Sequence, residues 1–382
     1  MAGTDNYKTV VVASDSFKGS LRSSEVAASV ASGILSVCPS CRVIGVPIAD
    51  GGEGTVEAVV TAAGGSYVEK EVSDPLMRKV RARYGMINET TAVIEIASAS
   101  GLTLLNPSER NPMLTTTYGT GELVLDALER GCRKIILGLG GSATTDGATG
   151  LLGALGYRFL DSRSNPLFGC GESLGRIARI DAENLTRLLR GVEIILASDV
   201  RSPLCGPLGA AAVFAPQKGA DASAVEMLDK GLANFAKAVF VYNGMDITDM
   251  EGAGAAGGAG GGLASLLGAR LRSGIDVVLE TMGFDRIIRG SDLVITGEGR
   301  IDRQTVMGKA PAGVLRAAQR EGIPVAAIGG TVESCTELEL SGFAAMVSAT
   351  PFGMPLSEAM RGDVAAANVR RAASEIARKF LL

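Results

Sequence analysis

The beginning of the chain alternates short β-branched runs with helical segments, and this order restricts the fold more than any other feature. Residues 9–14 form an apolar run typical of a buried strand, and residues 23–35 place apolar side chains on one face of a helix. A second strand is expected at 42–47, followed by a second helix at 55–63. Two consecutive strand–helix units predict a parallel sheet with crossover helices.

The pattern changes after the second helix and returns late in the chain. In between, residues 80–84 and 91–96 resemble the two strands of a hairpin, which favours a mixed sheet. Residues 292–296 again have the composition of a buried strand, and residues 310–321 that of a helix. We therefore predict two α/β domains, one formed by both chain ends and a mixed-sheet domain inserted into it. The predicted domains are residues 1–71 plus 286–382, and residues 72–285.

The 382-residue chain contains no histidine, and this absence excludes several kinds of active site. It removes the commonest general base and the commonest zinc ligand, so a Ser-His-Asp or Cys-His nucleophile is excluded. Acid–base chemistry must then come from Asp, Glu, Lys, Tyr or Cys. The formal net charge of −4 argues against general nucleic-acid binding, because no basic excess is available to neutralise phosphates.

Cys38 and Cys41 are separated by two residues and allow two interpretations. One is a redox or zinc pair, but a redox pair should open a helix, whereas this one follows a predicted helix, and no second pair for zinc is present. The other, which we favour, is that the cysteines are reduced thiols of a cytoplasmic protein. The polar start of the chain, which lacks the features of a signal peptide, agrees with that compartment.

Residues 252–262 consist almost entirely of glycine and alanine. The segment is too rich in glycine for a membrane helix, so no membrane association is expected. It is interpreted either as a flexible loop, or as a hinge or a segment whose backbone approaches a ligand closely.

The sequence GLGGSATTDGATG (138–150) follows an apolar run at 134–137, so a buried strand is expected to lead into a glycine-rich loop. The loop matches G-x-G-x-x-A, and Asp161 lies where a dinucleotide fold places its ribose-binding acid. An NAD- or nucleotide-binding oxidoreductase or sensor is therefore one interpretation. A capped helix N-terminus without a ligand is a second. The third is a phosphate-binding loop, which its hydroxyl side chains and Asp146 favour.

Three predicted strands of the terminal domain end in glycine-rich loops with charged side chains. These loops are Asp15–Ser20, Ala49–Thr55 and Thr296–Asp302. Ligands of open α/β sheets bind at the carboxyl ends of the strands, so we expect the loops to form one site. Lys18 suits a phosphoryl or carboxylate group there. In the inserted domain, Asp199 follows a strand at 193–197, in a segment with no structural need for an acid.

The composition of these loops suits the transfer of a phosphoryl group to a small polar acceptor. Such a reaction needs positioning, cationic and N–H stabilisation of charge, a metal, and an acid that takes the acceptor proton. All of these parts are available without histidine.

Together, the motifs resemble those of the bacterial type I glycerate kinases. The resemblance is carried, in the family's order, by DSFKGSL, ADGGEGT, ERNPMLTTTYGTGEL, GLGGSATTDG, SDVRSPLCG, PQKGA, GAGAAGG and TGEGRIDRQT, and the tail is also similar. It implies two α/β domains, one of them flavodoxin-like with the second inserted. It also implies ATP- and Mg²⁺-dependent phosphorylation of D-glycerate, with 2-phosphoglycerate as the favoured product, by a cytoplasmic kinase that binds neither nucleic acid nor membrane.

The motifs and the resemblance together predict a role for the individual residues. The predicted catalytic residues are Asp199, as the base, and Lys18; Asp199 and Asp146 are the candidate Mg²⁺ ligands. The predicted substrate-binding residues are Ser16, Asp50, Gly51, Glu298, Arg300 and Asp302. The predicted nucleotide-binding residues are Gly138, Gly140, Gly141, Ser142, Ala143, Thr144 and Lys218. Asp50 and Asp302 are the alternative bases.

Five positions depart from the family pattern. Thr145 and Ser202 stand where Asn is usual, and Met77, Ala148 and Ala215 stand where Gly is usual. The changes are conservative in size and are expected to be tolerated. Ser202 is the one of most interest, because an Asn there could contact a metal or a phosphate.

Overall fold

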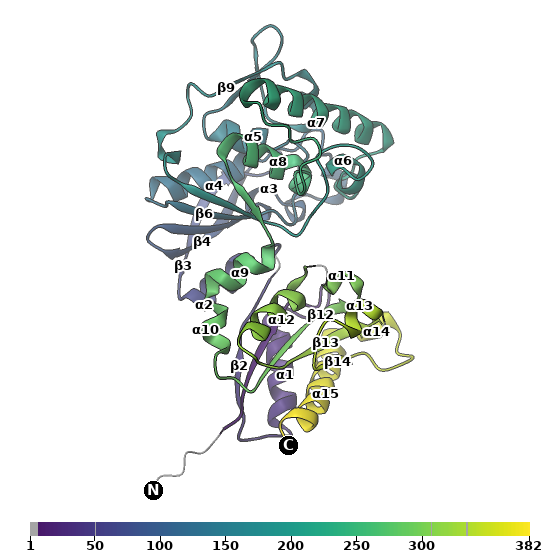
Figure 1. Ribbon diagram of the computed structural model, residues 1–382. Helices are drawn as coiled ribbons and strands as arrows, with labels where there is room; N and C mark the ends of the chain where they lie inside the picture. The colour runs from purple at the N-terminus through teal and green to yellow at the C-terminus, as the bar shows by residue number, and fades with distance from the viewer. Residues whose placement is uncertain (1–6, 50, 307, 334) are drawn as a thin grey trace. The chain divides into compact units, whose positions relative to one another are not determined.

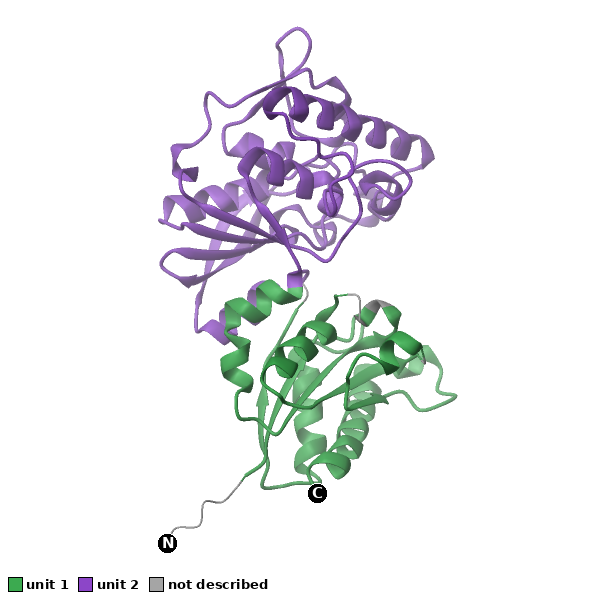
Figure 2. Ribbon diagram, viewed as in Figure 1, with its two compact units in different colours: residues 1–50, 275–382 green, residues 51–274 purple. Residues whose placement is uncertain are grey.

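The computed structural model describes residues 7–49, 51–306, 308–333 and 335–382. The chain forms two compact units (Figure 2). Unit 1 consists of residues 1–50 and 275–382, and unit 2 of residues 51–274. Each unit has its own sheet and its own hydrophobic core, so the predicted class of two α/β domains is confirmed.

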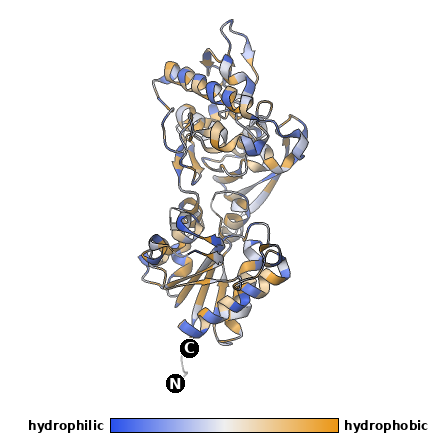
Figure 3. Ribbon diagram, turned by 90° about the vertical axis from the view of Figure 1, so that its right-hand side faces the viewer, coloured by the Kyte–Doolittle hydropathy of each residue, from blue (hydrophilic) through white to orange (hydrophobic). Residues whose placement is uncertain are grey.

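Unit 1 is built on a five-stranded parallel sheet (Figure 1). Its strands are β1 (Thr9–Ser14), β2 (Arg42–Gly45), β12 (Leu293–Ile301), β13 (Val325–Val332) and β14 (Ala345–Ser348). They are arranged as β2-β1-β12-β13-β14, with every neighbouring pair parallel. Counted along unit 1 alone this order is 2-1-3-4-5, which is the flavodoxin-like topology. The central strands are hydrophobic along most of their length (Figure 3), as expected for a sheet covered on both faces.

Helices cover both faces of the unit 1 sheet. They are α1 (Ser23–Leu35), α9 (Gly274–Met282), α10 (Phe284–Ile288), α11 (Arg303–Val306), α12 (Ala310–Arg320), α13 (Thr336–Glu339), α14 (Leu356–Ala359) and α15 (Gly362–Phe380). Helices α1 and α15 lie side by side, because Gly33 lets the backbones approach and its carbonyl accepts a hydrogen bond of 3.0 Å from the Ser374 hydroxyl (Figure 1). Their apolar faces form one core with Val10 and Val12 of β1.

Unit 2 contains a six-stranded mixed sheet and a small three-stranded sheet. The large sheet comprises β3 (Ser66–Ser73), β4 (Lys79–Asn88), β5 (Thr91–Glu95), β6 (Lys134–Gly138), β10 (Glu193–Ala197) and β11 (Arg270–Arg272), in the order β3-β4-β5-β6-β10-β11. The first two pairs are antiparallel and the other three are parallel. The small sheet is antiparallel and comprises β7 (Arg158–Leu160), β8 (Pro166–Leu167) and β9 (Arg179–Asp181).

Seven α-helices pack around the unit 2 sheets in the described part of the chain. They are α2 (Thr55–Ala63), α3 (Ala97–Ser100), α4 (Tyr118–Glu129), α5 (Thr149–Ala154), α6 (Ala210–Phe214), α7 (Ala222–Asn243) and α8 (Ala255–Leu267). Helix α8 contains most of the glycine-rich segment at 252–262, and its residues are buried. The flexible-loop interpretation of that segment is therefore wrong.

The two units divide the chain at 50/51 and 274/275, whereas the sequence placed the boundaries at 71/72 and 285/286. Helix α2 belongs to unit 2, because the Val56 N–H donates a hydrogen bond of 2.8 Å to Glu95 at the end of β5. Helix α9 belongs to unit 1, where Arg316 of α12 pairs with Asp276 at 2.7 Å.

Cys38 and Cys41 form a disulfide, which differs from the expected reduced thiols. The turn after α1 brings the two residues together, since the Cys41 N–H donates to the Cys38 carbonyl at 3.1 Å. The described helices include none that is both long and apolar enough to cross a lipid bilayer.

Candidate active site

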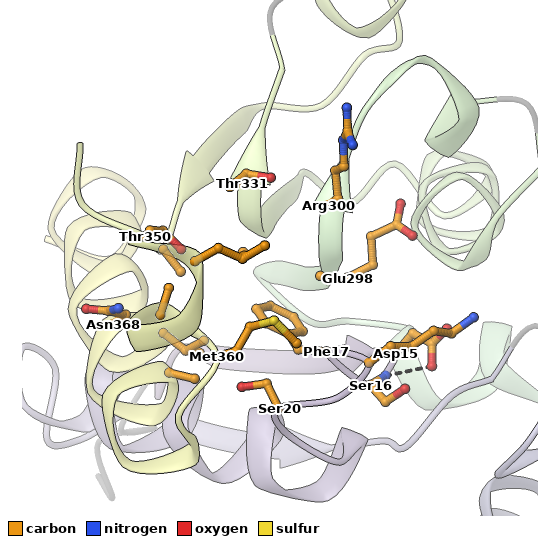
Figure 4. A pocket seen from close by; sticks show the side chains of 18 of the residues that line it. Asp15, Ser16, Phe17, Ser20, Glu298, Arg300, Thr331, Thr350, Met360 and Asn368 are labelled. Carbon is orange, nitrogen blue, oxygen red and sulfur yellow. Dashed lines mark hydrogen bonds between the residues drawn. The ribbon is translucent and has the colours of Figure 1, made fainter. Parts of the chain in front are cut away.

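Unit 1 has a pocket of about 680 Å³ at the carboxyl ends of its strands (Figure 4). Strands β1 and β12 are neighbours, and the chain continues from β1 to β2 on one side and from β12 to β13 on the other. Ligands of open α/β sheets bind at the point where the connections diverge in this way. The pocket is lined by the last residues of β12 and β13, by residues that follow β1, β12, β13 and β14, and by α14 and α15. Its polar lining includes Asp15, Ser16, Lys18, Glu298, Arg300, Lys309, Thr331, Glu333, Thr350 and Asn368. The structure thus brings together Ser16, Lys18, Glu298 and Arg300, as expected.

Glu298 lies inside a network of three neighbours. Its Oε1 accepts a hydrogen bond of 2.6 Å from the Thr305 hydroxyl, and its Oε2 lies 3.6 Å from Lys309 Nζ. Lys309 also lies 3.9 Å from Asp302. Burial raises the pKa of Glu298 above its ordinary value, although the Thr305 hydrogen bond and the Lys309 charge oppose the rise. Thr305 and Lys309 were missed from the sequence; Thr305 closes the TGEGRIDRQT motif and was detectable there.

Arg300 projects from the end region of β12 and is 63% exposed. Its guanidinium pairs with Glu333 and lies 3.5 Å from Asp302. A ligand carboxylate that binds Arg300 must therefore compete with Glu333, and nothing in the sequence indicated this pair.

Asp50 and Gly51 were expected to lie beside these loops. Asp50 lies outside the described residues. Gly51 belongs to unit 2, where a side chain at this position would meet the Ala197 carbonyl oxygen at 2.9 Å. A side chain at Gly138 would meet the Gly51 carbonyl oxygen at 2.6 Å, and one at Gly140 would meet the Gly52 Cα at 2.5 Å. These glycines allow the two loops of unit 2 to pack backbone against backbone.

The loop after β6 presents an unusual number of unused hydrogen-bond donors. Among the described residues, the backbone N–H groups of Gly141, Ser142, Thr144 and Thr145 donate no hydrogen bond. The buried hydroxyls of Thr144 and Thr145 also have no partner. Unpaired polar groups are rare inside proteins, and a cluster of N–H groups on a glycine-rich loop is typical of anion sites.

Asp146 is completely buried and organises this loop. Its carboxylate accepts hydrogen bonds from the N–H and hydroxyl of Thr117 at 2.8 and 2.7 Å, and from the N–H groups of Ala148 and Gly150 at 3.2 Å. Burial raises its pKa, while these hydrogen bonds oppose the rise. These contacts use the Asp146 carboxylate to hold the loop and the start of α5, which does not favour its predicted role as a Mg²⁺ ligand.

Lys218, at the end of a 3-10 turn (Pro216–Lys218), is 2% exposed. Its Nζ donates to Ser142 Oγ at 2.9 Å and to the Thr144 carbonyl at 2.6 Å. It therefore contacts the predicted nucleotide loop from the protein interior.

Asp199 follows β10 and is exposed, and its Oδ1 accepts a hydrogen bond of 2.9 Å from the Gly274 N–H. The described residues contain no group of three or more His, Cys, Asp or Glu that could hold a metal. Mg²⁺ at phosphoryl-transfer sites is bound by one or two carboxylates together with phosphate oxygens. An exposed carboxylate such as Asp199 fits that requirement.

Asp161 does not fit a dinucleotide site. Strand β7, which precedes it, belongs to the small sheet and not to the sheet of β6, so there is no strand–helix–strand unit. Its carboxylate instead closes a turn by accepting hydrogen bonds of 2.8 Å from the N–H groups of Arg163 and Asn165.

Comparison with known proteins agrees with the kinase interpretation. The model of the glycerate kinase family matches residues 10–381. The chain belongs to the glycerate kinase family. It is 45% identical over 375 residues to the glycerate kinase of Bacillus subtilis, covering 98% of each chain. It is 42% identical to the glycerate 2-kinase of Escherichia coli, covering 96% of this chain and 97% of that one.

The fold is also that of a solved relative. A crystal structure of a protein assigned as glycerate kinase 2 from Salmonella typhimurium LT2 superposes with a TM-score of 0.85, at 41% sequence identity and over 98% of both chains. Family membership and the position of Asp161 together favour a kinase over the oxidoreductase alternative.

Proposed function

We propose that this enzyme transfers the γ-phosphoryl group of ATP to D-glycerate, forming phosphoglycerate and ADP, with 2-phosphoglycerate as the favoured product. Family membership and the names of the relatives support the reaction. The structural observation that carries the proposal is the loop after β6, whose unused N–H groups and hydroxyls suit the oxygens of a polyphosphate.

In the proposed reaction, a hydroxyl oxygen of glycerate forms a bond to the γ-phosphorus, and the bond from that phosphorus to the β–γ bridging oxygen breaks. The hydroxyl proton passes to a carboxylate, for which Asp199 is our candidate. The phosphates bind at Gly138, Gly140, Gly141, Ser142, Ala143 and Thr144. Mg²⁺, which Asp199 could alternatively hold, would neutralise charge on the phosphate oxygens.

The glycerate side is proposed to lie at the unit 1 pocket. Lys18 and Arg300 are cations that suit the glycerate carboxylate and the transferred phosphoryl group. Ser16, Glu298 and Asp302 offer acceptors for the glycerate hydroxyls. The sequence predicted a substrate-binding role also for Asp50, which lies outside the described residues, and for Gly51, which belongs to unit 2. Both partners are then small molecules, in agreement with a cytoplasmic enzyme that binds neither nucleic acid nor membrane.

The proposal is tested by mixing the purified enzyme with ATP, Mg²⁺ and D-glycerate. We expect glycerate-dependent formation of ADP, and ³¹P NMR of the product should show coupling of phosphorus to the single proton on C2. Coupling to two protons would assign C3 instead. NAD should not stabilise the protein against heating, whereas ATP with Mg²⁺ should; stabilisation by NAD alone, without phosphorylation, would contradict the proposal.

A further inference from the structure

Lys218 is buried in unit 2, and the hydrogen bonds of its amino group go to a hydroxyl and a carbonyl rather than to a carboxylate. Lysine is almost never fully buried unless it is paired, because moving its charge out of water is costly. Burial lowers the pKa of Lys218 to about 7, while the charge of Asp146 acts in the opposite direction. The fold therefore tolerates an unfavourable group at this position, and the contacts of its ammonium group indicate what it does.

The first contact fixes the direction of a hydroxyl. In its protonated form Lys218 can only donate hydrogen bonds, so the bond of 2.9 Å then makes Ser142 Oγ the acceptor. The hydroxyl hydrogen of Ser142 is then left to point elsewhere, and no described residue accepts it. A positive charge on its oxygen side also makes this hydroxyl a stronger donor.

The second contact fixes the direction of a peptide group. Lys218 binds the Thr144 carbonyl oxygen at 2.6 Å. In a planar trans peptide the carbonyl and the following N–H point in opposite directions, so the Thr145 N–H is turned away from Lys218. This N–H is one of those without an acceptor among the described residues.

The glycine-rich segment holds the same peptide from a second direction. Gly257, with φ of +67°, packs so closely that a side chain there would meet the Thr145 Cα at 2.6 Å. Its carbonyl also accepts a hydrogen bond of 3.1 Å from the Gly147 N–H. This close packing of Gly257 on the loop backbone explains why the buried segment at 252–262 needs glycine at this position.

We propose that Lys218 is a positioning residue that aims two donors of the loop, the Ser142 hydroxyl and the Thr145 N–H, at a phosphate group of the nucleotide. Lys218 does not contact the nucleotide itself. The inference rests on the proposed function, and it replaces the direct nucleotide contact that the sequence predicted for Lys218.

The test uses Lys218→Met, which keeps the length of the side chain and removes its charge and donors. We expect the dissociation constant for ATP, measured by titration calorimetry, to rise at least ~10-fold, and the KM for glycerate to change less than ~2-fold. The substitution also leaves the buried Thr144 carbonyl without its donor, so a moderate fall in the melting temperature is expected and the ATP dissociation constant is the deciding readout. A lower melting temperature with normal ATP affinity would show a structural role and overturn the proposal.

Ser142→Ala provides a second test that buries no new group. Its ATP dissociation constant should also rise, but less than in Lys218→Met, because the Thr145 N–H keeps its direction. The double variant should bind ATP about as weakly as Lys218→Met alone, because the Ser142 hydroxyl acts only when Lys218 orients it. Normal ATP binding by Ser142→Ala would overturn the proposal even if Lys218→Met failed to fold. Lys218→Arg should retain part of the affinity, and Lys230→Met, an exposed lysine paired with Glu226 on α7, is the matched control. Glycerate-dependent ADP formation by the wild-type enzyme tests the proposed function independently of these variants.

Discussion

The two candidate regions use different chemistry to face an anion. In unit 1, the pocket has long charged side chains that pair with each other, as Arg300 does with Glu333 and Lys309 with Glu298. In unit 2, the loop after β6 offers neutral backbone and hydroxyl donors, and its charged residues, Asp146 and Lys218, are buried behind it. In unit 2, packing therefore fixes the loop donors before a ligand binds. In unit 1, the ion pairs between side chains must break before the same side chains can bind a ligand.

This contrast predicts different kinds of sensitivity. Steric changes should be most harmful in unit 2, where the loop backbone has no room to adjust. Charge changes should be most harmful in unit 1, where side chains supply the contacts. Asp199 is an exception to this contrast, because it is a charged side chain of unit 2 with a proposed role in the chemical step. Removing its charge tests whether charge also matters in unit 2.

The largest effect is expected for Asp199→Asn. The Asn side-chain oxygen can still accept the hydrogen bond from the Gly274 N–H, so the substitution mainly removes the charge. If Asp199 is the base, kcat should fall ~100-fold or more while ATP and glycerate binding persist. If it is a metal ligand, the enzyme should need more Mg²⁺ and bind ATP more weakly. Steady-state kinetics at several Mg²⁺ concentrations separates the two roles.

Asp285→Asn removes an exposed carboxylate that pairs with Arg320, and it should leave these parameters unchanged. A fully active Asp199→Asn enzyme would contradict both roles, and the base would then be sought at Asp50 or Asp302.

The next effect concerns the loop itself. Gly141 has φ of +76° and is exposed, unlike Gly138 and Gly140, whose replacement would push into backbone. Gly141→Val should therefore obstruct the approach of a phosphate, and the dissociation constant for ATP should rise at least ~10-fold in a protein that remains folded. Gly131→Val is the matched control, since Gly131 also has a positive φ, +98°, with nothing near its missing side chain. Equal ATP affinity in the two variants would show that this loop does not bind the phosphates of ATP.

A smaller effect is expected in unit 1 for Arg300→Lys. The charge remains but the planar fork that holds a carboxylate is lost, so the KM for glycerate should rise ~10-fold, with ATP affinity unchanged. Arg303→Lys, which changes an exposed arginine paired with Glu337, is the control. Glu333→Gln sharpens the test, because release of Arg300 from its internal partner should lower the KM for glycerate. An Arg300→Lys enzyme with a normal glycerate KM would exclude Arg300 from the site.

Much of the architecture was predictable because the apolar periodicity of the strands and helices survives in the structure. The helices at 23–35 and 55–63 and the strand at 193–197 have the predicted bounds. The domain boundary was not predictable, because α2 looks like part of the first repeating unit and only its packing on β5 shows that it belongs to unit 2. Strand β3 was also missed, since most of its residues are exposed and polar.

The candidate site was predictable as a set of loops but not in its detail. Glycines and acids in a motif indicate that a loop is special, but they do not show whether a side chain faces the ligand or the interior. Asp146 and Lys218 have the residue types of metal and phosphate ligands, yet their hydrogen bonds hold the loop itself. Only the three-dimensional contacts distinguish the two cases.

The smallest predicted effect comes from a position where this sequence departs from the pattern of the family. Met77 has φ of +64° in the exposed turn between β3 and β4, a conformation that suits the usual glycine. A non-glycine residue there costs ~1–2 kcal/mol, and glycine costs ~0.5–1 kcal/mol in conformational entropy, so Met77→Gly should stabilise unit 2 by up to ~1 kcal/mol. Calorimetry should show a rise in the melting temperature of ~2–4 °C at most, with unchanged kinetics. Leu76→Gly, one residue earlier and without a positive φ, should instead lower it; a fall for both variants would show that the turn is not strained at Met77.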